Sequence, residues 1–419
     1  MKKLIIFSIG LFYLSFYSYA ASAEEVLTWK DCIDEARKNH PDLVSAEEQI
    51  YQQQASKIIT GSTLYPQVNG SINWSRTKTT TQKDSYSYGV TGSQLIFNGS
   101  KTTNDLKAAS ENIRAAQYNF RFTSSEVRFR LRAAFINLLN AQELLKITED
   151  IAKIRRDNLI LISLSYEAGI EHKGAVLTAE ANLTQAESEI VQARRDIEIS
   201  QRALLKEMGR TEFFLISVKE EFKVSDSAQK KPDFEFLAKN NPSLGKLNAQ
   251  TSAASFGIKS AEANFYPEIT ASAGADRTGV RFPPDQDQWN IGVGLSIPIF
   301  EGNLRKAEVK KAKAVYNQAQ ADERSKKDSV ILILEQTWAS LQNAIDTAKV
   351  QKKFLTAAEE RAKIAEGQYS LGLIQFDNWT IIEDSLVQAK KAFLNAEANA
   401  MLAEASWIEA KGDTLEYEN

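Results

Sequence analysis

The chain has 419 residues, and its 51 basic and 54 acidic side chains nearly balance, for a net charge of −3. This balance excludes the basic surface that nucleic-acid binding requires. One cysteine and two histidines rule out an intrachain disulfide and argue against a zinc site, so we expect no cofactor and no metal. We expect Cys32 to pack inside a helix, and His40 and His172 to lie on the surface.

The first 23 residues have the pattern of a secretory signal peptide. Two lysines precede an apolar run at residues 4–19, and three small residues follow at 21–23. The alternative is a membrane anchor, but this run is shorter than the ~20 residues that a spanning helix needs. We therefore expect cleavage near Ala23, which places the mature protein outside the cytoplasm.

The rest of the chain contains two similar modules about 200 residues apart. Four short motifs recur in the same order: Asn-x-Pro-x-Leu at 39–43 and 240–244, Tyr-Pro at 65–66 and 266–267, Ile-Phe-x-Gly at 96–99 and 299–302, and Tyr-x-x-Gly at 166–169 and 369–372. A period this long indicates a duplicated module and not a solenoid. We expect modules at 24–210 and 233–411, a connecting segment with one or two short strands at 211–232, and a loose tail at 412–419.

Each module is expected to begin with a helix that ends at Tyr-Pro, because the residue before a proline favours extended geometry. In the first module this helix runs from Leu27 to about Leu64, with an interruption at Pro41. A β-hairpin follows at 67–97 and again at 267–299, because apolar and polar residues alternate there with a period of two. The apolar face carries Val68, Ile72, Trp74, Tyr86, Tyr88, Val90, Ile269, Trp289, Ile291, Val293 and Leu295.

The two strand faces differ in a way that indicates a membrane sheet. One is aliphatic and aromatic, as expected toward lipid, and the other is small and polar, as expected toward a wet lumen. The alternative, two hairpins lying on a soluble core, fits less well, since both modules repeat the uniformly polar face. Four strands cannot close a barrel, and open edges in lipid cost several kcal/mol per unpaired group. A dimer would close 8 strands and a trimer 12, and a conducting duct favours three chains or more.

A long proline-free stretch follows each hairpin, at 101–165 and 304–368. Leucine, alanine and tyrosine recur every seven residues in both, from Leu131 to Tyr166 and from Leu334 to Tyr369, which predicts helices packed as in coiled coils. About 65 residues at 1.5 Å each give a rod of about 100 Å. Return helices are expected at 175–208 and 377–410, each after a turn at Gly169 or Gly372.

These motifs, in this order and in both modules, resemble the TolC family of outer-membrane efflux proteins over essentially all of the mature chain. The resemblance implies an α+β, mostly α-helical fold of duplicated helix–hairpin–helix modules. It implies a homotrimer with one 12-stranded β-barrel in outer-membrane lipid, continuous with a long periplasmic α-helical barrel. It further implies docking of a periplasmic adaptor and an inner-membrane transporter. The implied function is an export channel, for efflux or type I secretion, and not an enzyme.

The resemblance also places a periplasmic entrance at the second Tyr-x-x-Gly turn, where Tyr369 and Gly372 match, with Tyr166 and Gly169 at the first turn. The best-known members carry an arginine two residues after the glycine and an aspartate six after it. Here Ile374 and Asn378 stand at these positions. The entrance is therefore either the polar lock of those members or a looser, more apolar constriction.

The residues Ile374, Phe376 and Asp377 would form the apolar constriction. For Asp377 two interpretations stay open. Three copies near a three-fold axis would form an acidic ring that attracts cations, whereas a single copy after the turn could be the N-cap of the return helix.

Two other classes of protein remain as alternatives. One is a non-conducting trimeric structural or adhesive outer-membrane protein. Large hairpin tips would indicate this class, but the tips here are short and polar. The other is a soluble periplasmic adaptor, which the aromatic strand faces disfavour.

Overall fold

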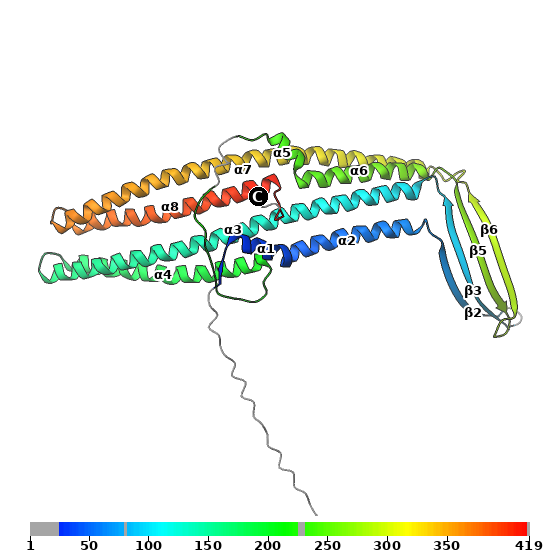
Figure 1. The fold of residues 1–419 in the computed structure, drawn as a ribbon, viewed down its shortest axis with the longest axis horizontal. Coiled ribbons are helices and arrows are strands. Elements are labelled where there is room, and N and C mark those ends of the chain that lie inside the picture. The colour runs from blue at the N-terminus through cyan, green and yellow to red at the C-terminus, as the bar shows by residue number, and fades with distance from the viewer. Residues whose placement is uncertain (1–24, 79–81, 225–230, 417–419) are drawn as a thin grey trace, which may run out of the picture.

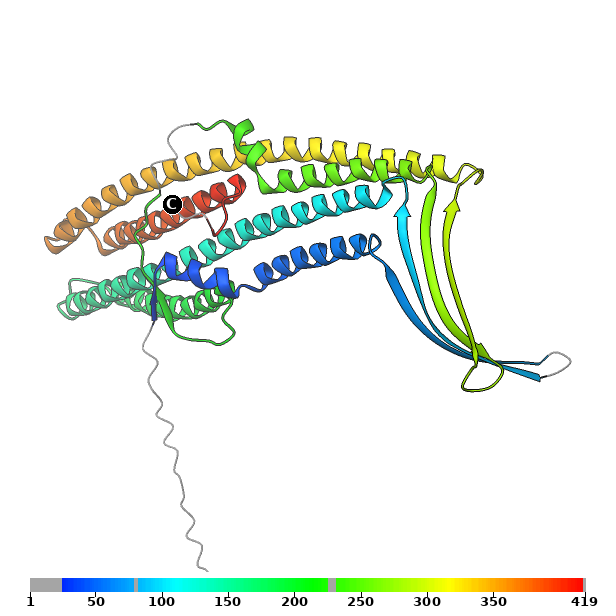
Figure 2. The ribbon, with the colours of Figure 1, turned by 45° about the vertical axis from the view of Figure 1, so that its right-hand side comes forward.

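The computed structural model describes residues 25–78, 82–224 and 231–416, so the signal peptide expected at 1–23 lies outside the described residues. The molecule is an elongated helical bundle with a curved β-sheet at one end (Figures 1 and 2). Among the described helices, none combines the length and the apolar character needed to cross a membrane.

The same order of elements occurs twice. The first set is α1 (Trp29–Asn39), α2 (Pro41–Ser62), β2 (Gln67–Lys78), β3 (Gln82–Phe97), α3 (Lys101–Glu167) and α4 (Lys173–Met208). The second set is α5 (Phe234–Asn240), α6 (Pro242–Ala263), β5 (Glu268–Gly279), β6 (Gln286–Ser296), α7 (Leu304–Ser370) and α8 (Phe376–Lys411). Helices α3 and α7 each have 67 residues, α4 and α8 each have 36, and α2 and α6 each have 22, which identifies the sets as duplicates.

Helices α3 and α7 run the whole length of the helical part (Figure 1). Near the sheet, α2 and α6 lie beside them, and α4 and α8 lie beside their other halves. At 1.5 Å per residue, each long helix spans about 100 Å. The heptad residues Leu131, Leu138, Leu334 and Leu341 are fully buried, so the seven-residue period marks the packed faces of these helices.

The four long strands form one antiparallel sheet in the order β2-β3-β5-β6, joined between the hairpins by β3 and β5. Direct register partners lie on the same face, for example Ile72 opposite Tyr88 and Ala275 opposite Trp289. The strands have 12, 16, 12 and 11 residues. The last strand ends at Ser296 and not at 299, since Pro298 has no N–H to donate to a ladder.

The helix expected to start at Leu27 begins later. Residues Glu25–Leu27 form a short strand, β1, which pairs in parallel with β4 (Ile216–Val218) of the connecting segment. Thr28 then caps α1 through a capping box with Asp31. Three residues are too few to show alternation, so this pairing has no periodic signal in the sequence. The interruption expected at Pro41 is present, because Pro41 is the first residue of α2.

The expectation that His40 lies on the surface is wrong. Its exposed fraction is 4%, and it caps α2 by accepting the N–H of Asp42 on Nδ1. Its burial depends on Glu207, which is 167 residues away in α4 and thus invisible to a local pattern. His172 is exposed, and Cys32 is fully buried in α1, where burial raises the pKa of its thiol to about 12.

The tail was expected to be loose, but residues 412–416, which the structure describes, are packed against the first module. Leu415 is fully buried in the cluster that contains Leu131 and Phe135 of α3. Its N–H donates to the Ser124 hydroxyl (3.1 Å), and its carbonyl accepts from Arg37 (2.7 Å). An apolar residue in a polar segment can thus anchor a terminus, although the composition of the segment suggests solvent exposure.

Candidate functional site

Two helical turns meet at the end of the molecule farthest from the sheet. One joins α3 to α4 at Gly169 and the other joins α7 to α8 at Gly372, and both glycines have positive φ, at 76° and 72°. Each turn is closed by a bond back to the helix, such as Leu373 N to Gln368 O (2.9 Å). Only glycine adopts this left-handed conformation without strain, which explains its place in the Tyr-x-x-Gly motif.

Tyr369 connects these two turns. Its hydroxyl donates to Glu171 Oε1 (3.1 Å), a residue of the first turn. Its ring stacks on Trp379 of α8, with centroids 4.5 Å apart and planes at 14°. Burial and the nearby Glu171 carboxylate raise the pKa of Tyr369 to about 12, so the hydroxyl stays protonated and keeps donating at neutral pH. Tyr166, at the matching position of the first module, is exposed instead.

The residues after Gly372 separate into buried and exposed ones. Phe376 is 4% exposed and packs with Trp379 in a cluster that also holds Ile162 of α3. The expectation that Phe376 lines an apolar constriction is therefore wrong in this conformation. Ile374 is half-buried against the same cluster, whereas Asp377 and Asn378 are exposed.

The interpretation of Asp377 as a helix cap is also wrong. Gln375 is the N-cap of α8 and has extended backbone geometry, and Asp377 is the second residue of the helix. No side chain caps this helix end through a hydrogen bond. Asp377 lies in the first turn, where a carboxylate interacts favourably with the helix dipole.

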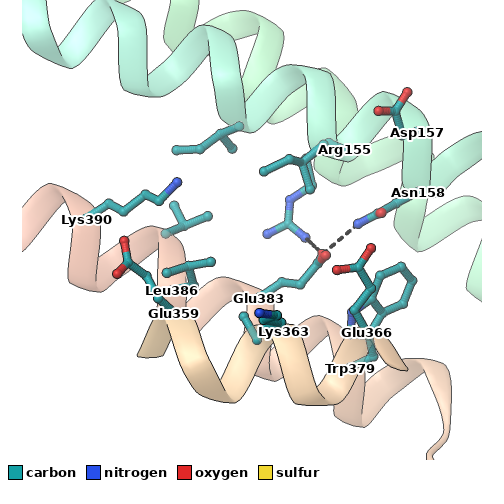
Figure 3. Close-up of a pocket in the computed structure, with 14 residues that line it drawn as sticks. Arg155, Asp157, Asn158, Glu359, Lys363, Glu366, Trp379, Glu383, Leu386 and Lys390 are labelled. Carbon is teal, nitrogen blue, oxygen red and sulfur yellow. Dashed lines mark hydrogen bonds and ion pairs between the residues drawn. The ribbon is translucent and has the colours of Figure 1, made fainter. Parts of the chain in front are cut away.

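A cavity of ≈ 340 Å³ lies between α3, α7 and α8, on the sheet side of these turns (Figure 3). Arg155 of α3, 7% exposed, donates to Glu383 of α8 (2.8 Å) and also bonds Asp384. Asn158 donates to the same Glu383 carboxylate (2.6 Å). Burial raises the pKa of Glu383, against the opposing effects of Asn158 and Arg155. Charged groups of both modules are thus paired away from solvent.

Sequence reasoning missed Arg155, although a signal exists. Thr148, Ile151, Ala152, Arg155 and Ile162 are all buried, at helical spacings of three, four and seven. An arginine within such an apolar stripe must find a partner when the helix packs, because an unpaired buried charge is costly.

At the other end, the structure places all eleven residues predicted to face lipid on one side of the sheet. Nine are exposed, from 37% for Tyr88 to 86% for Ile72, and Tyr86 and Ile269 are half-buried. Most residues on the opposite side are serine, threonine, asparagine, glutamine or glycine. Among the described residues, no group of three histidine, cysteine, aspartate or glutamate side chains could hold a metal.

Known proteins share this architecture. The family model of the outer membrane efflux protein matches residues 32–210 and 236–412. The outer membrane efflux protein BepC of Brucella suis is 22% identical, over 94% of this chain and 86% of that protein. The outer membrane protein TolC of Escherichia coli is 22% identical, over 100% of this chain and 88% of that protein.

Solved structures show the same fold. A crystal structure of CusC superposes with a TM-score of 0.81 at 19% identity, over 91% of each chain. At this identity the likeness concerns the fold alone, whereas the family model covers most of the chain, including both Tyr-x-x-Gly turns and both hairpins. The chain therefore belongs to the family of outer membrane efflux proteins.

Proposed function

We propose that the protein is a homotrimeric export channel, in which three copies of the sheet close one 12-stranded barrel and the long helices continue it as a periplasmic duct. Membership of the outer membrane efflux family carries the export function and the outer-membrane location. The trimer, the barrel and the entrance are our inferences for this chain.

The sheet is the observation that carries this proposal. Strands β2 and β6 are its edges, and within the described part of the chain each pairs on one side only. One face is apolar along all four strands and cannot lie in water at low cost, while the other is polar. In lipid, the backbone groups at both edges of the sheet must find hydrogen-bond partners, so the sheet must close into a barrel. Other copies of this chain carry the same edges and can supply these partners without another protein. Three copies give a lumen wide enough to conduct.

The duct opens at the two turns. The Tyr369–Glu171 bond joins the α3–α4 hairpin to the α7–α8 hairpin, and Arg155 joins them again farther from the tip. Opening would require the α7–α8 hairpin to move away from α3 and break these polar contacts. A periplasmic adaptor and an inner-membrane transporter would supply the energy for this movement.

The experiment is a conductance measurement on the full chain. The protein, purified from the outer-membrane fraction, should migrate as a heat-sensitive trimer and form ion-conducting pores in planar bilayers. The same gene should restore export in cells that lack it. A protein that reaches the outer membrane as a trimer but never conducts would refute the channel and favour a structural or adhesive role.

A further inference from the structure

A patch of aromatic and basic side chains lies on the apolar face of the sheet, at the end farthest from the helices. Trp74 and Tyr86 are register partners in β2 and β3, and the ring of Phe282, from the loop before β6, lies 6.0 Å from that of Tyr86. The guanidinium carbon of Arg76 lies 5.6 Å from the centre of the Trp74 ring. Together with Lys78 and with Arg281, the exposed neighbour of Phe282, these four residues form what we call the rim patch.

The rim patch continues the apolar face of β2. Side chains two residues apart share a face of a strand, so Lys78 and Arg76 follow Trp74 and Ile72 in one row. Along this row the surface changes from aliphatic to aromatic and then to cationic. The next lysine, Lys83, pairs in register with Thr77 and thus lies on the opposite, polar face.

The charges of this region favour an anion. Arg76 contacts the Asp84 carboxylate (2.6 Å), and both side chains keep contact with solvent. Lys78 is exposed, and so is Arg281, the neighbour of Phe282. Within residues 25–78, 82–224 and 231–416, no carboxylate forms an ion pair with either of them. On the same face, Arg277 pairs with Asp287 (2.6 Å), so both carboxylates of this face are already paired with arginines. Lys78 and Arg281 are thus two cations of the described chain that are left to bind an anion beside the three aromatic rings.

This combination selects one kind of ligand. Arginine and lysine bind phosphate oxygens through charge-assisted hydrogen bonds. Aromatic rings at the boundary of a membrane lie against headgroups and the first carbons of acyl chains. Free phosphate would use the cations but leave the rings without a partner, whereas a lipid with a phosphorylated headgroup uses both.

We propose that the rim patch binds the phosphorylated headgroup of a glycolipid of the outer leaflet, with Arg76, Lys78 and Arg281 holding phosphate oxygens. The assignment to the outer leaflet rests on the proposed function, which puts the helices in the periplasm and the hairpin tips outside. The rings of Trp74, Tyr86 and Phe282 pack against the sugar and the upper part of the acyl chains.

The test uses the purified full-length trimer in detergent and three probes: lipid A with two phosphates, lipid A without phosphates, and inorganic phosphate. Bound lipid is counted by native mass spectrometry, and affinity is measured by titration. Wild type should prefer phosphorylated lipid A. The double variant Arg76→Gln/Lys78→Gln should bind it about ten-fold more weakly, since two charge-assisted bonds are lost.

Lys83→Gln is the control for position, because it removes one positive charge from the same hairpin but on the opposite face. It should bind phosphorylated lipid A as wild type does. Equal loss in Lys83→Gln and in the double variant would overturn the proposal, as would equal binding of the two forms of lipid A. Inorganic phosphate bound as tightly as the lipid would show a site for free phosphate and would also overturn it.

Conductance separates this inference from the proposed function. All three proteins should form trimers on gels and conduct in bilayers of uncharged lipid. Retained conductance with no preference for phosphorylated lipid would refute the lipid site alone. Absent conductance in wild type would refute the channel, whatever the lipid result.

Discussion

Glu207 of α4 is a nearly buried carboxylate with three donors around it. Arg130 (3.1 Å) and Lys206 (2.8 Å) donate to its oxygens. His40 lies 3.4 Å away, and because its Nδ1 accepts the N–H of Asp42, its proton is on Nε2, which donates to Glu207. The bond from His40, followed by those from Lys206 and Arg130, lowers the pKa of Glu207 from 4.5 to about 2 despite burial.

This pKa predicts an acid-sensitive stability. Between pH 4.5 and 2 the unfolded chain binds a proton at Glu207 that the folded chain does not. The contribution of Glu207, up to about 3 kcal/mol, is therefore complete above pH 4.5 and lost as the pH falls toward 2. Thermal unfolding midpoints of the trimer across this range should fall less in Glu207→Gln than in wild type. Glu187→Gln, on the exposed side of α4, is the control, and an identical slope in all three proteins would contradict the prediction.

Arg155 and Arg156 form a natural comparison. The side chain of Arg155 is 8% exposed and pairs with Glu383, whereas that of Arg156 is 59% exposed and pairs with Glu187. Arg155→Gln leaves Glu383 buried without its cation, which should lower stability by roughly 3–5 kcal/mol. Arg156→Gln should change it by less than about 1 kcal/mol. Denaturant unfolding of both variants measures the difference, and equal losses would mean that the cavity is wet enough to solvate Glu383.

Among the elements, the sheet offers the sharpest test, because adjacent residues face opposite ways. Ile72→Arg puts a charge on the apolar face, two residues from Trp74 of the rim patch, and should impair assembly by up to roughly 2 kcal/mol, less than at the membrane midplane. Ser71→Arg puts the same charge on the polar face and should assemble, with altered conductance. Heat-sensitive trimers on gels report assembly. If both variants assemble equally well, the assignment of faces to lipid and lumen is wrong.

The bounds of long periodic elements could be predicted from the sequence, whereas among the short elements only a strand in the connecting segment, which is β4, was expected. The long helices expected at 101–165 and 304–368 appear as 101–167 and 304–370, because many heptads average out local exceptions. Strands β1 and β4, with three residues each, depend on each other for their hydrogen bonds. Helix α5 has seven residues and depends on Phe234, whose ring contacts Trp338 and Trp407. Contacts between residues far apart in the sequence produce no periodic pattern, so the sequence alone does not predict them.

The candidate entrance shows the same division. The positions of Gly169 and Gly372 follow from a local turn that only glycine adopts easily, so the motif was sufficient. The burial of Phe376 and the pairing of Arg155 with Glu383, 228 residues away, depend on how two hairpins pack. Packing between the modules depends on contacts between side chains of different helices, and the periodic pattern of one helix does not predict such contacts.

For the whole molecule, the contacts between the two helical hairpins should control opening. Tyr369→Phe removes the hydroxyl that reaches Glu171 but keeps the ring that stacks on Trp379. The variant should fold normally and spend more time open, because one of the polar contacts between the turns is lost. Single-channel recordings measure the open fraction. An open fraction equal to that of wild type would show that this bond does not hold the entrance closed.

The exposed Asp377 should set ion preference if three copies surround the entrance. Since Asp377 lies inside the first turn of α8 and is not its N-cap, Asp377→Asn keeps the shape of the turn and removes only the charge. We expect lower cation selectivity and weaker block by multivalent cations added from the periplasmic side. Reversal potentials in salt gradients measure the selectivity, and the prediction fails if they are unchanged.

The burial of Leu415 bears on how the protein is made. Leu415 completes a cluster with Leu131 and Phe135, yet it follows Ser124, which accepts its N–H, by 291 residues. Until residue 415 is synthesised and packed, the buried cluster of the first module therefore lacks one of its side chains. A chain cut short before residue 415 lacks this side chain, so we expect proteases to digest its first module faster than that of the full chain. Leu415 therefore couples the packing of the first module to the completion of the second.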